Sequence, residues 1–283
     1  MEDNGTMKHL DLSASIVIYR TPIKEIENCL KCLCNAGVSE IFIVNNSPSE
    51  IYNRLALEYK LTYLELTKNI GFGKAHNIAI HRSTKKFHLV INADVSFDQN
   101  VPSRMIETME KNVDAVAAGP AVLYPDGEPQ YVYRNIPTVT SLLSRRFFSS
   151  SIIRRWLSAD AIYVGLPEHE PVSIPCLSGC FFIAKTDALQ KVGGFDPRYF
   201  MYMEDIDISR QLLTLGKILH EPRAVIYHKF GGQSRRYGRL FVLHCISAIR
   251  YFAKWGFTVS KKEEVLHALC QMYLEKIPNP HGQ

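Results

Sequence analysis

The sequence predicts an α/β protein in which helices flank a mostly parallel central sheet. Short runs of β-branched and other apolar residues alternate along the first part of the chain with segments of helical periodicity. Strands that alternate with helices form parallel sheets with right-handed crossovers. A chain of 283 residues is long enough to bury a full core around such a sheet.

The first strand is expected at residues 15–19, where the sequence reads SIVIY. Thr21 and Pro22 follow as a hydroxyl cap and a proline at the first helical position, so a helix should begin there. That helix should end at Gly37, because glycine adopts the left-handed conformation that follows many helices. Further strands are expected at 40–46, 61–66 and 87–95, with helices at about 49–60 and from residue 71.

The second part of the chain has a different pattern. Prolines are frequent over 125–175, which predicts a long excursion with short helices. A buried strand that runs into a helix is expected at 180–189, a turn-rich loop at 192–200 and a helix after it. A last strand at 224–228 and a helical segment at 237–256 complete the predicted order. No repeat or linker divides the chain, so one domain over 1–283 is predicted.

Composition limits the classes of function. The net charge of +5 and the pI of about 8.7 favour an anionic ligand or membrane surface but are too weak to indicate nucleic acid. No signal core and no apolar run of 18 residues occur, so a soluble or peripheral cytoplasmic protein is expected. Cys29, Cys32, Cys176 and Cys180 have the spacing of zinc ligands, but the helical pattern around the first two favours free thiols in a reducing cytosol.

Polar residues follow four of the predicted strands. They are Tyr19-Arg20-Thr21, Asn45-Asn46-Ser47, Thr67-Lys68-Asn69 and Asn92-Ala93-Asp94. Ligands of open α/β sheets bind beyond the carboxyl ends of the strands. The four ends therefore predict one site, although any one of them taken alone is an ordinary polar loop.

An acidic helix is expected to begin at Glu204. With 100° per residue, Glu204 and Asp205 flank its apolar stripe and should point inward, whereas Asp207 and Arg210 lie outside the stripe and Asp207 should face solvent. Acids in a first turn often do no more than suit the helix dipole. Two adjacent inward carboxylates are costly to bury without a role, and the dipole should keep such an acid ionised, as a general base must be.

Three further features could bind a phosphate or a cation. Asp94 ends an apolar strand and can hold a divalent cation, although an Asx turn or helix cap accounts for it equally well. His228 also ends a strand, and Arg235 and Arg236 in the glycine-containing loop after it could close over phosphates; a core histidine and solvated arginines are the simpler alternatives. GFGKAHN at 71–77 places glycines and Lys74 at a helix start, which suits an anion, but it lacks the spacing of a dinucleotide or P-loop motif.

Together these segments resemble the successive motifs of the inverting family 2 glycosyltransferases, closest to the bacterial rhamnosyltransferase-like branch. The segments that carry the resemblance are IVIYRTP, IVNNS, NIGFGKAHNIAI, NADV, SGCFFIAKTDALQKVGGFDPRYFMYMEDIDISRQL and AVIYHKFGG. They occur in order over about residues 13–235. The resemblance implies a GT-A fold, a nucleotide-sugar donor and a divalent metal, Mg²⁺ or Mn²⁺.

The resemblance also implies roles for individual residues. Asp94 and His228 would hold the metal, Asp205 would be the base and Glu204 would orient the acceptor. Gly179 and Cys180 would line the sugar pocket. The remaining nucleotide-binding candidates are Tyr19, Thr21, Asn45, Asn69, Gly71, Lys74, Asn77 and Asn92. Two departures stand out: Asn45 replaces an Asp that the family often has, and Asn92 replaces the first Asp of the D-x-D motif, which leaves one carboxylate for the metal.

The resemblance predicts transfer of rhamnose or a hexose from dTDP-rhamnose or a UDP-hexose to a polysaccharide or lipid-linked glycan. Residues 13–124 would bind the donor, 125–235 the acceptor, and 236–283 would be a helical extension. The alternatives are a non-catalytic carbohydrate-binding scaffold and a sugar-nucleotide pyrophosphorylase. The pyrophosphorylase would need a glycine-rich basic loop after the first strand, where this chain has YRTPIKE.

Two basic and aromatic tracts predict contact with an anionic membrane. SRRFFSSSIIRRW at 144–156 contains Arg145, Arg146, Arg154 and Arg155, and either a lipid-facing or a core position suits it equally. For the second tract, which begins at Arg239, a core position is favoured because its many apolar residues could cover the sheet.

Overall fold

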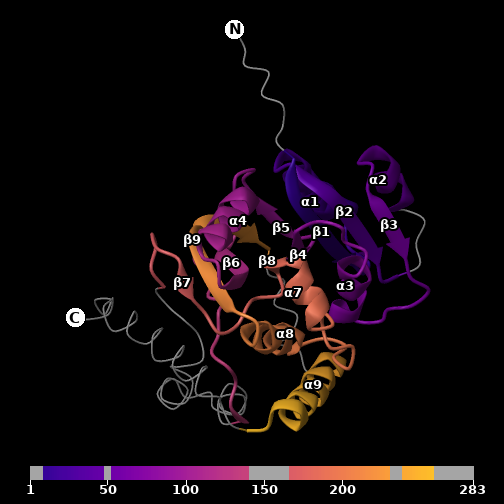
Figure 1. The fold of residues 1–283 in the computed structure, drawn as a ribbon. Helices are drawn as coiled ribbons and strands as arrows, with labels where there is room; N and C mark the ends of the chain where they lie inside the picture. Colours follow the sequence, from indigo (N-terminus) through magenta and orange to yellow (C-terminus); the bar gives the residue numbers. More distant parts are fainter. Residues whose placement is uncertain (1–8, 48–51, 140–165, 230–237, 258–283) are drawn as a thin grey trace.

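A computed structural model describes residues 9–47, 52–139, 166–229 and 238–257. The described elements form a twisted sheet with helices on both faces (Figure 1). In chain order they are β1 (Leu10–Ile18), α1 (Ile23–Asn35), β2 (Val38–Asn45), α2 (Asn53–Glu58), β3 (Thr62–Glu65), α3 (Phe72–Ile80), β4 (Phe87–Ile91), β5 (Val95–Phe97), α4 (Val101–Lys111), β6 (Ala115–Leu123), β7 (Val172–Ser173), β8 (Phe181–Lys185), α7 (Thr186–Lys191), α8 (Glu204–Leu213), β9 (Lys217–His228) and α9 (Arg239–Trp255).

The strand order in the sheet is β3-β2-β1-β4-β8-β6-β9-β5, and β7 also pairs with β9. The first four strands of this order run parallel, which confirms the predicted architecture. β8 lies antiparallel between β4 and β6. Because of this reversal, β8 begins at the edge where β4 ends, so residues that precede β8 lie beside residues that follow β4.

Side chains from both faces of the sheet are buried, as expected for a sheet with helices on each side. In β4, for example, Leu89 packs in the core that includes Ile26 of α1 and Met105 of α4. Val90 faces the opposite way and packs in the core that includes Leu189 of α7 and Leu212 of α8. The helix that begins at Glu204 is therefore held against the sheet by its apolar stripe.

Three local predictions need correction. The strand expected at 87–95 is broken after Ile91, and its last part is β5, which pairs with β9 instead. Thr21 does not cap α1: Pro22 is the N-cap, and the Thr21 hydroxyl accepts a hydrogen bond from the Tyr19 N–H. Residues 129–138 of the 125–175 excursion contain no helix; instead, a turn at 124–128 returns the chain along the end of β6.

Candidate active site

The predicted edge residues from β4, β8, α8 and β9 converge. The Asn92 N–H donates to the Cys180 carbonyl at 2.9 Å, which fixes the end of β4 beside the start of β8. A Cβ built on Gly179 would lie 3.7 Å from the Asp205 Cβ. Burial raises the pKa of the Cys180 thiol to about 12, and the charges of Asp94 and Asp205 add to that increase. The metal candidate and the base candidate therefore lie near the same thiol.

Glu204 and Asp205 form a coupled acidic pair at the start of α8. Burial raises the pKa of Glu204 to about 8, and the Asp205 charge contributes to that rise. Burial also raises the pKa of Asp205, but the charge of Arg134 and the backbone N–H groups of Ile206 and Gly179 oppose this effect. Arg134 and these N–H groups therefore favour the negative charge on Asp205, and burial favours the proton on Glu204.

The inward position of this pair is confirmed, but the expected effect of the helix dipole is not. Glu204 is 7% exposed, and its Oε2 has no hydrogen-bond partner among the described residues. Desolvation outweighs the dipole, so the pKa of the carboxyl groups rises instead of staying low. A buried carboxyl oxygen without a partner is costly, and a hydroxyl of a bound substrate would satisfy it.

The backbone before this pair is strained. Tyr202 and Met203 have φ of 70° and 68°, two consecutive non-glycine residues in the left-handed region. Each such residue costs about 1 kcal/mol. Such strain persists only where the surrounding structure enforces it, and it clusters at functional sites.

Replacing Glu204 with glutamine should stabilise the protein at alkaline pH. The pKa of Glu204 is raised from 4.5 to about 8 by folding, so the folded state binds this proton more tightly and the free energy of unfolding falls as pH rises through that window. The glutamine side chain has no proton to lose in this range. By scanning calorimetry, we expect the Tm of the variant minus the Tm of wild type to be several degrees larger at pH 9 than at pH 5.

The matched control is Glu58→Gln, on an exposed position of α2, which should show no such gain. If the Tm difference between Glu204→Gln and wild type were the same at pH 5 and at pH 9, the raised pKa of Glu204 would be contradicted.

Asp207 does not face solvent, and this prediction was wrong. The Asp207 side chain is fully buried and accepts hydrogen bonds from Lys254 at 2.9 Å and from the Trp255 indole at 2.7 Å. Arg210 is likewise buried and lies over the ring of Trp255. Both residues contact α9, which packs on the side of α8 away from the sheet (Figure 1).

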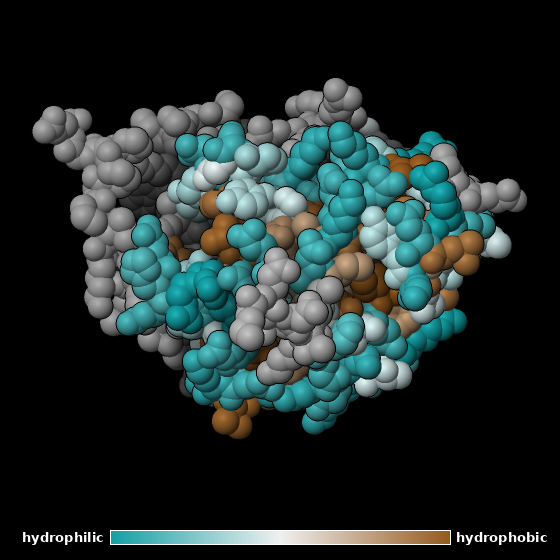
Figure 2. Space-filling view, turned by 90° about the horizontal axis from the view of Figure 1, so that it is seen from above, coloured by the Kyte–Doolittle hydropathy of each residue, from teal (hydrophilic) through white to brown (hydrophobic). Residues whose placement is uncertain are grey.

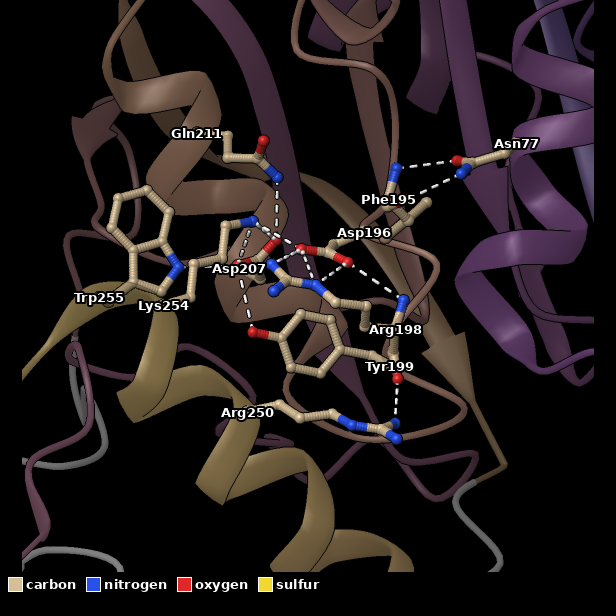
Figure 3. Close-up of polar contacts among 10 residues, drawn as sticks. All are labelled: Asn77, Phe195, Asp196, Arg198, Tyr199, Asp207, Gln211, Arg250, Lys254 and Trp255. Carbon is tan, nitrogen blue, oxygen red and sulfur yellow. Dashed lines mark hydrogen bonds and ion pairs between the residues drawn. The ribbon is translucent and has the colours of Figure 1, made fainter.

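Figure 3 shows that this cluster also fastens the 192–200 loop. Lys254 donates to Asp196 as well as Asp207, and Asp196 pairs with Arg198. The two carboxylates share one lysine across three segments of the chain. The cluster therefore joins α8, α9 and the loop into one unit beside the acidic pair.

Asp94 and His228 lie together, as the resemblance implied. Asp94 Oδ1 is 3.4 Å from His228 Nε2. Metal–oxygen distances of hard divalent cations are about 2.0–2.6 Å, so both atoms can reach one ion. No three His, Cys, Asp or Glu residues gather as a metal-binding group within the described ranges. A cation here would thus have these two side chains as ligands and would complete its coordination with substrate phosphates and water.

The strand-end residues divide into two groups. Tyr19 is 48% exposed and is available to a ligand. Asn45 is fully buried: its amide donates to the Tyr63 hydroxyl and accepts from the Ser47 N–H and hydroxyl. The resemblance assigns Asn45 to the nucleotide base, but these bonds account for it as a support of the sheet edge.

The helix-start segment is occupied by the protein's own groups. The Gly71 N–H donates to the Asn69 side chain and the Phe72 N–H to the Phe200 carbonyl. Asn77 makes two hydrogen bonds to the backbone of Phe195 (Figure 3). The N–H groups of Gly71 and Phe72 are therefore already hydrogen-bonded within the protein and are not available to the expected anion.

The remaining predicted residues have mixed outcomes. Lys74 is exposed, and Thr21 and Asn92 are half-buried at the sheet edge. Arg235 and Arg236 lie outside the described residues. The described cysteines form no disulfide with one another, and Cys29 and Cys180 are buried, in agreement with core thiols rather than zinc ligands.

Two residues of the site were not predicted. Arg134 lies near enough to lower the pKa of Asp205, and Gln130 bonds to the His228 ring. Both residues follow the turn at 124–128, whose PDG sequence predicts a chain reversal. That signal could have indicated that the residues after the turn return to the sheet edge. A cavity of about 490 Å³ opens beside Asp94, between the start of α1 and the ends of β5 and β9, with Lys24, Tyr227 and Lys229 in its wall.

The sheet order and the paired acids at its edge define a glycosyltransferase of the GT-A class. Solved structures share this fold. GalNAc-T7 with UDP, GalNAc and Mn²⁺ matches with a TM-score of 0.61 at 12% identity, over 96% of this chain and 57% of that one. The mannosyltransferase PcManGT from Pyrobaculum calidifontis, in complex with GDP-Man and Mn²⁺, matches with a TM-score of 0.54 at 13% identity, over 95% of this chain and 81% of that one.

The chain belongs to glycosyl transferase family 2, whose family model matches residues 13–193. It is 29% identical over 175 residues, 57% of this chain and 56% of the relative, to an N-acetylglucosaminyl-diphospho-decaprenol L-rhamnosyltransferase of Mycobacterium tuberculosis. It is 24% identical to the rhamnosyltransferase WbbL of Escherichia coli K12, over 65% of this chain and 70% of that protein. The chain thus spans just over half the length of the mycobacterial relative.

Proposed function

We propose that this protein transfers a sugar, with inversion, from a nucleoside-diphosphate donor to a hydroxyl of a polysaccharide or lipid-linked glycan. The observation that carries the proposal is that residues 179 and 180 lie beside both acidic segments: the Asn92 N–H donates to the Cys180 carbonyl, and a Cβ at Gly179 would lie 3.7 Å from the Asp205 Cβ. This proximity supports a cation ligand, Asp94, and a general base, Asp205, at one edge of the sheet. Residues 13–124 form the donor half of this proposal, and 125–235 form the acceptor half.

In the proposed reaction Asp205 takes the proton from the acceptor hydroxyl. The oxygen of that hydroxyl attacks the anomeric carbon while the nucleoside diphosphate leaves from the opposite face. Glu204, which keeps its proton at neutral pH, donates a hydrogen bond that orients the acceptor. Asp94 and His228 would hold Mg²⁺ or Mn²⁺, which would supply positive charge to the diphosphate leaving group.

The donor that we propose first is dTDP-rhamnose, and a UDP-hexose is second. Support for rhamnose comes from two relatives whose names describe rhamnosyl transfer. Support for a hexose comes from the poly-beta-1,6-N-acetyl-D-glucosamine synthase of Staphylococcus epidermidis, which is 27% identical over 66% of this chain and 42% of that protein. The name of the mycobacterial relative includes a lipid diphosphate, in line with a lipid-linked acceptor.

A thermal-shift panel of nucleotide sugars with Mn²⁺, followed by donor hydrolysis with and without EDTA, tests the proposal. We expect one donor to stabilise the protein and EDTA to stop its hydrolysis. Donor binding without hydrolysis or transfer would favour the scaffold alternative, and formation of a nucleotide sugar from sugar phosphate and nucleoside triphosphate would favour the pyrophosphorylase.

We also propose that α9 contacts the membrane that carries the acceptor. The core position expected for this tract is found in part, since Tyr251 is fully buried, but α9 packs on α8 and not on the sheet. Val242, Ile246 and Ile249 on one of its faces are 54%, 38% and 69% exposed. The opposite end of the molecule is mainly hydrophilic, with scattered hydrophobic patches (Figure 2). No described helix is both long and apolar enough to cross a bilayer, so contact here would be peripheral.

Changing Val242, Ile246 and Ile249 together to serine should weaken binding to phosphatidylglycerol vesicles by about tenfold or more, because each side chain would lose apolar burial worth about 1 kcal/mol or more. Co-sedimentation at low salt measures this. Leu57→Ser with Val113→Ser, at exposed apolar positions elsewhere, is the control. Equal binding of both variants and wild type would exclude α9 as the contact.

The first tract, 144–156, lies outside the described residues. The contribution of its arginines, Arg145, Arg146, Arg154 and Arg155, stays a prediction that a fourfold Arg→Gln variant tests in the same assay.

A further inference from the structure

Gln130 contacts both the ring and the backbone of His228. Gln130 Oε1 lies 2.7 Å from His228 Nδ1, and Gln130 Nε2 lies 3.4 Å from the His228 carbonyl oxygen. Both residues are buried, at 8% and 6% exposed. The Gln130 backbone is itself fixed, since its N–H donates to the Val122 carbonyl of β6 at 2.8 Å.

The two contacts determine the orientation of the Gln130 amide. With Oε1 on the ring, the NH₂ group faces a carbonyl oxygen, which is an acceptor. In the reversed orientation Oε1 would face that carbonyl, and two acceptors would oppose each other. The observed orientation therefore makes Gln130 Oε1 the acceptor, so His228 Nδ1 must carry the hydrogen.

This hydrogen has a consequence at the other ring nitrogen. In neutral imidazole one nitrogen is a donor and the other has a lone pair. If Nδ1 carries the hydrogen, the lone pair belongs to Nε2, the atom that lies 3.4 Å from Asp94 Oδ1. A lone pair on His228 Nε2 and the Asp94 carboxylate oxygen can both bind one cation between them. Histidine ligands of metals are commonly oriented by a hydrogen bond from their other ring nitrogen, here Nδ1.

We propose that Gln130 is a positioning residue, which holds His228 in the Nδ1–H tautomer so that Nε2 and Asp94 bind one divalent cation. The proposal rests on the cation site of the proposed function. It assigns a role to the turn at 124–128, because that turn carries Gln130 back along β6 to the end of β9.

The ring tautomer can be measured without metal. Protein labelled with ¹⁵N-histidine, with the His228 signals assigned by comparison with His228→Ala, should show a protonated Nδ1 and an unprotonated Nε2 in wild type. In Gln130→Met, which has similar volume but no acceptor, this tautomer should lose its preference. In Gln130→Glu one carboxyl oxygen keeps the acceptor for Nδ1–H, so Nδ1 should remain protonated although the second oxygen replaces the donor that faces the His228 carbonyl.

Cation affinity is the second readout. By calorimetry with Mn²⁺ and UDP, Gln130→Met should bind Mn²⁺ about 10–100-fold more weakly than wild type, the usual effect of losing a residue that orients a metal ligand. Gln130→Glu, which keeps the acceptor for Nδ1–H but loses the donor to the His228 carbonyl, should bind Mn²⁺ more tightly than Gln130→Met. Gln190→Met, on α7 where Gln190 donates to the Ile80 carbonyl, is the control for loss of a glutamine outside the site.

The outcomes separate this role from the proposed function. Wild type that shows a protonated Nε2, or equal Mn²⁺ affinity in wild type and Gln130→Met, would overturn the role of Gln130 alone. Wild type that binds no Mn²⁺ with UDP would overturn the cation site and, with it, this role.

Discussion

Asp205→Asn is expected to abolish sugar transfer while donor binding remains largely intact. Asparagine has nearly the same shape but cannot take the acceptor proton, and removal of a general base costs about 10²–10⁴-fold in rate. Asp205 is also the member of the acidic pair whose pKa the Arg134 charge lowers, whereas burial raises the pKa of Glu204 to about 8, so Glu204 is a poorer substitute for the base. Transfer rates give the loss, and calorimetry with the nucleotide sugar and Mn²⁺ gives donor affinity.

Asp187→Asn is the matched control for this experiment. Asp187 occupies the first turn of α7, and its Oδ1 accepts from the next backbone N–H, as Asp205 Oδ1 does on α8. Its variant should keep wild-type turnover. A transfer rate of Asp205→Asn within tenfold of wild type would refute the assignment of Asp205 as the base. If Glu204→Gln lost more rate than Asp205→Asn, Glu204 would be the base and Asp205 the residue that orients the acceptor.

Asp94→Ala is expected to eliminate metal-dependent nucleotide binding. Because Asn92 replaces the first carboxylate of the motif, Asp94 is the carboxylate that pairs with His228 at this edge. Loss of Asp94 should reduce metal affinity by more than the 10–100-fold that is typical when a residue supporting a metal ligand is removed. Calorimetry of UDP with and without Mn²⁺ measures the effect.

Asp98→Ala, at an exposed position just beyond β5, serves as the control and should leave Mn²⁺-dependent affinity unchanged. His228→Ala should weaken the same binding in part. Unchanged affinity in Asp94→Ala would remove the metal role, and unchanged affinity in His228→Ala would make His228 a core residue.

The parts of the fold and site that the sequence predicts are those that depend on local pattern. Alternating strands and helices gave the parallel half of the sheet, and polar strand ends gave Asp94 and His228. The convergence of Gly179 and Cys180 with them depends on the reversed direction of β8, which the order of elements does not reveal and which only the family resemblance supplied.

The errors have a common physical origin. The helical wheel placed Asp207 outward correctly with respect to the sheet, but it contains no information on α9, which covers that side with Lys254 and Trp255. Asn45 and Asn77 are nucleotide-binding candidates through the family resemblance, which carries no information on the hydrogen bonds that these two side chains make. In the structure Asn45 bonds to Tyr63 of β3 and Asn77 to the backbone of Phe195, and such contacts between distant segments are not visible in a local pattern.

The two left-handed residues before Glu204 limit how this protein can be engineered. Glycine at Tyr202 would relieve about 1 kcal/mol of backbone strain, whereas at Met203, which is buried in the core with Tyr251, the lost side-chain packing would outweigh that relief. The change at Tyr202 would let the start of α8 sample other directions and would move the proton acceptor away from the sugar. Thermostable variants obtained in this way should lose turnover, whereas stabilising changes on the distant α2 should not.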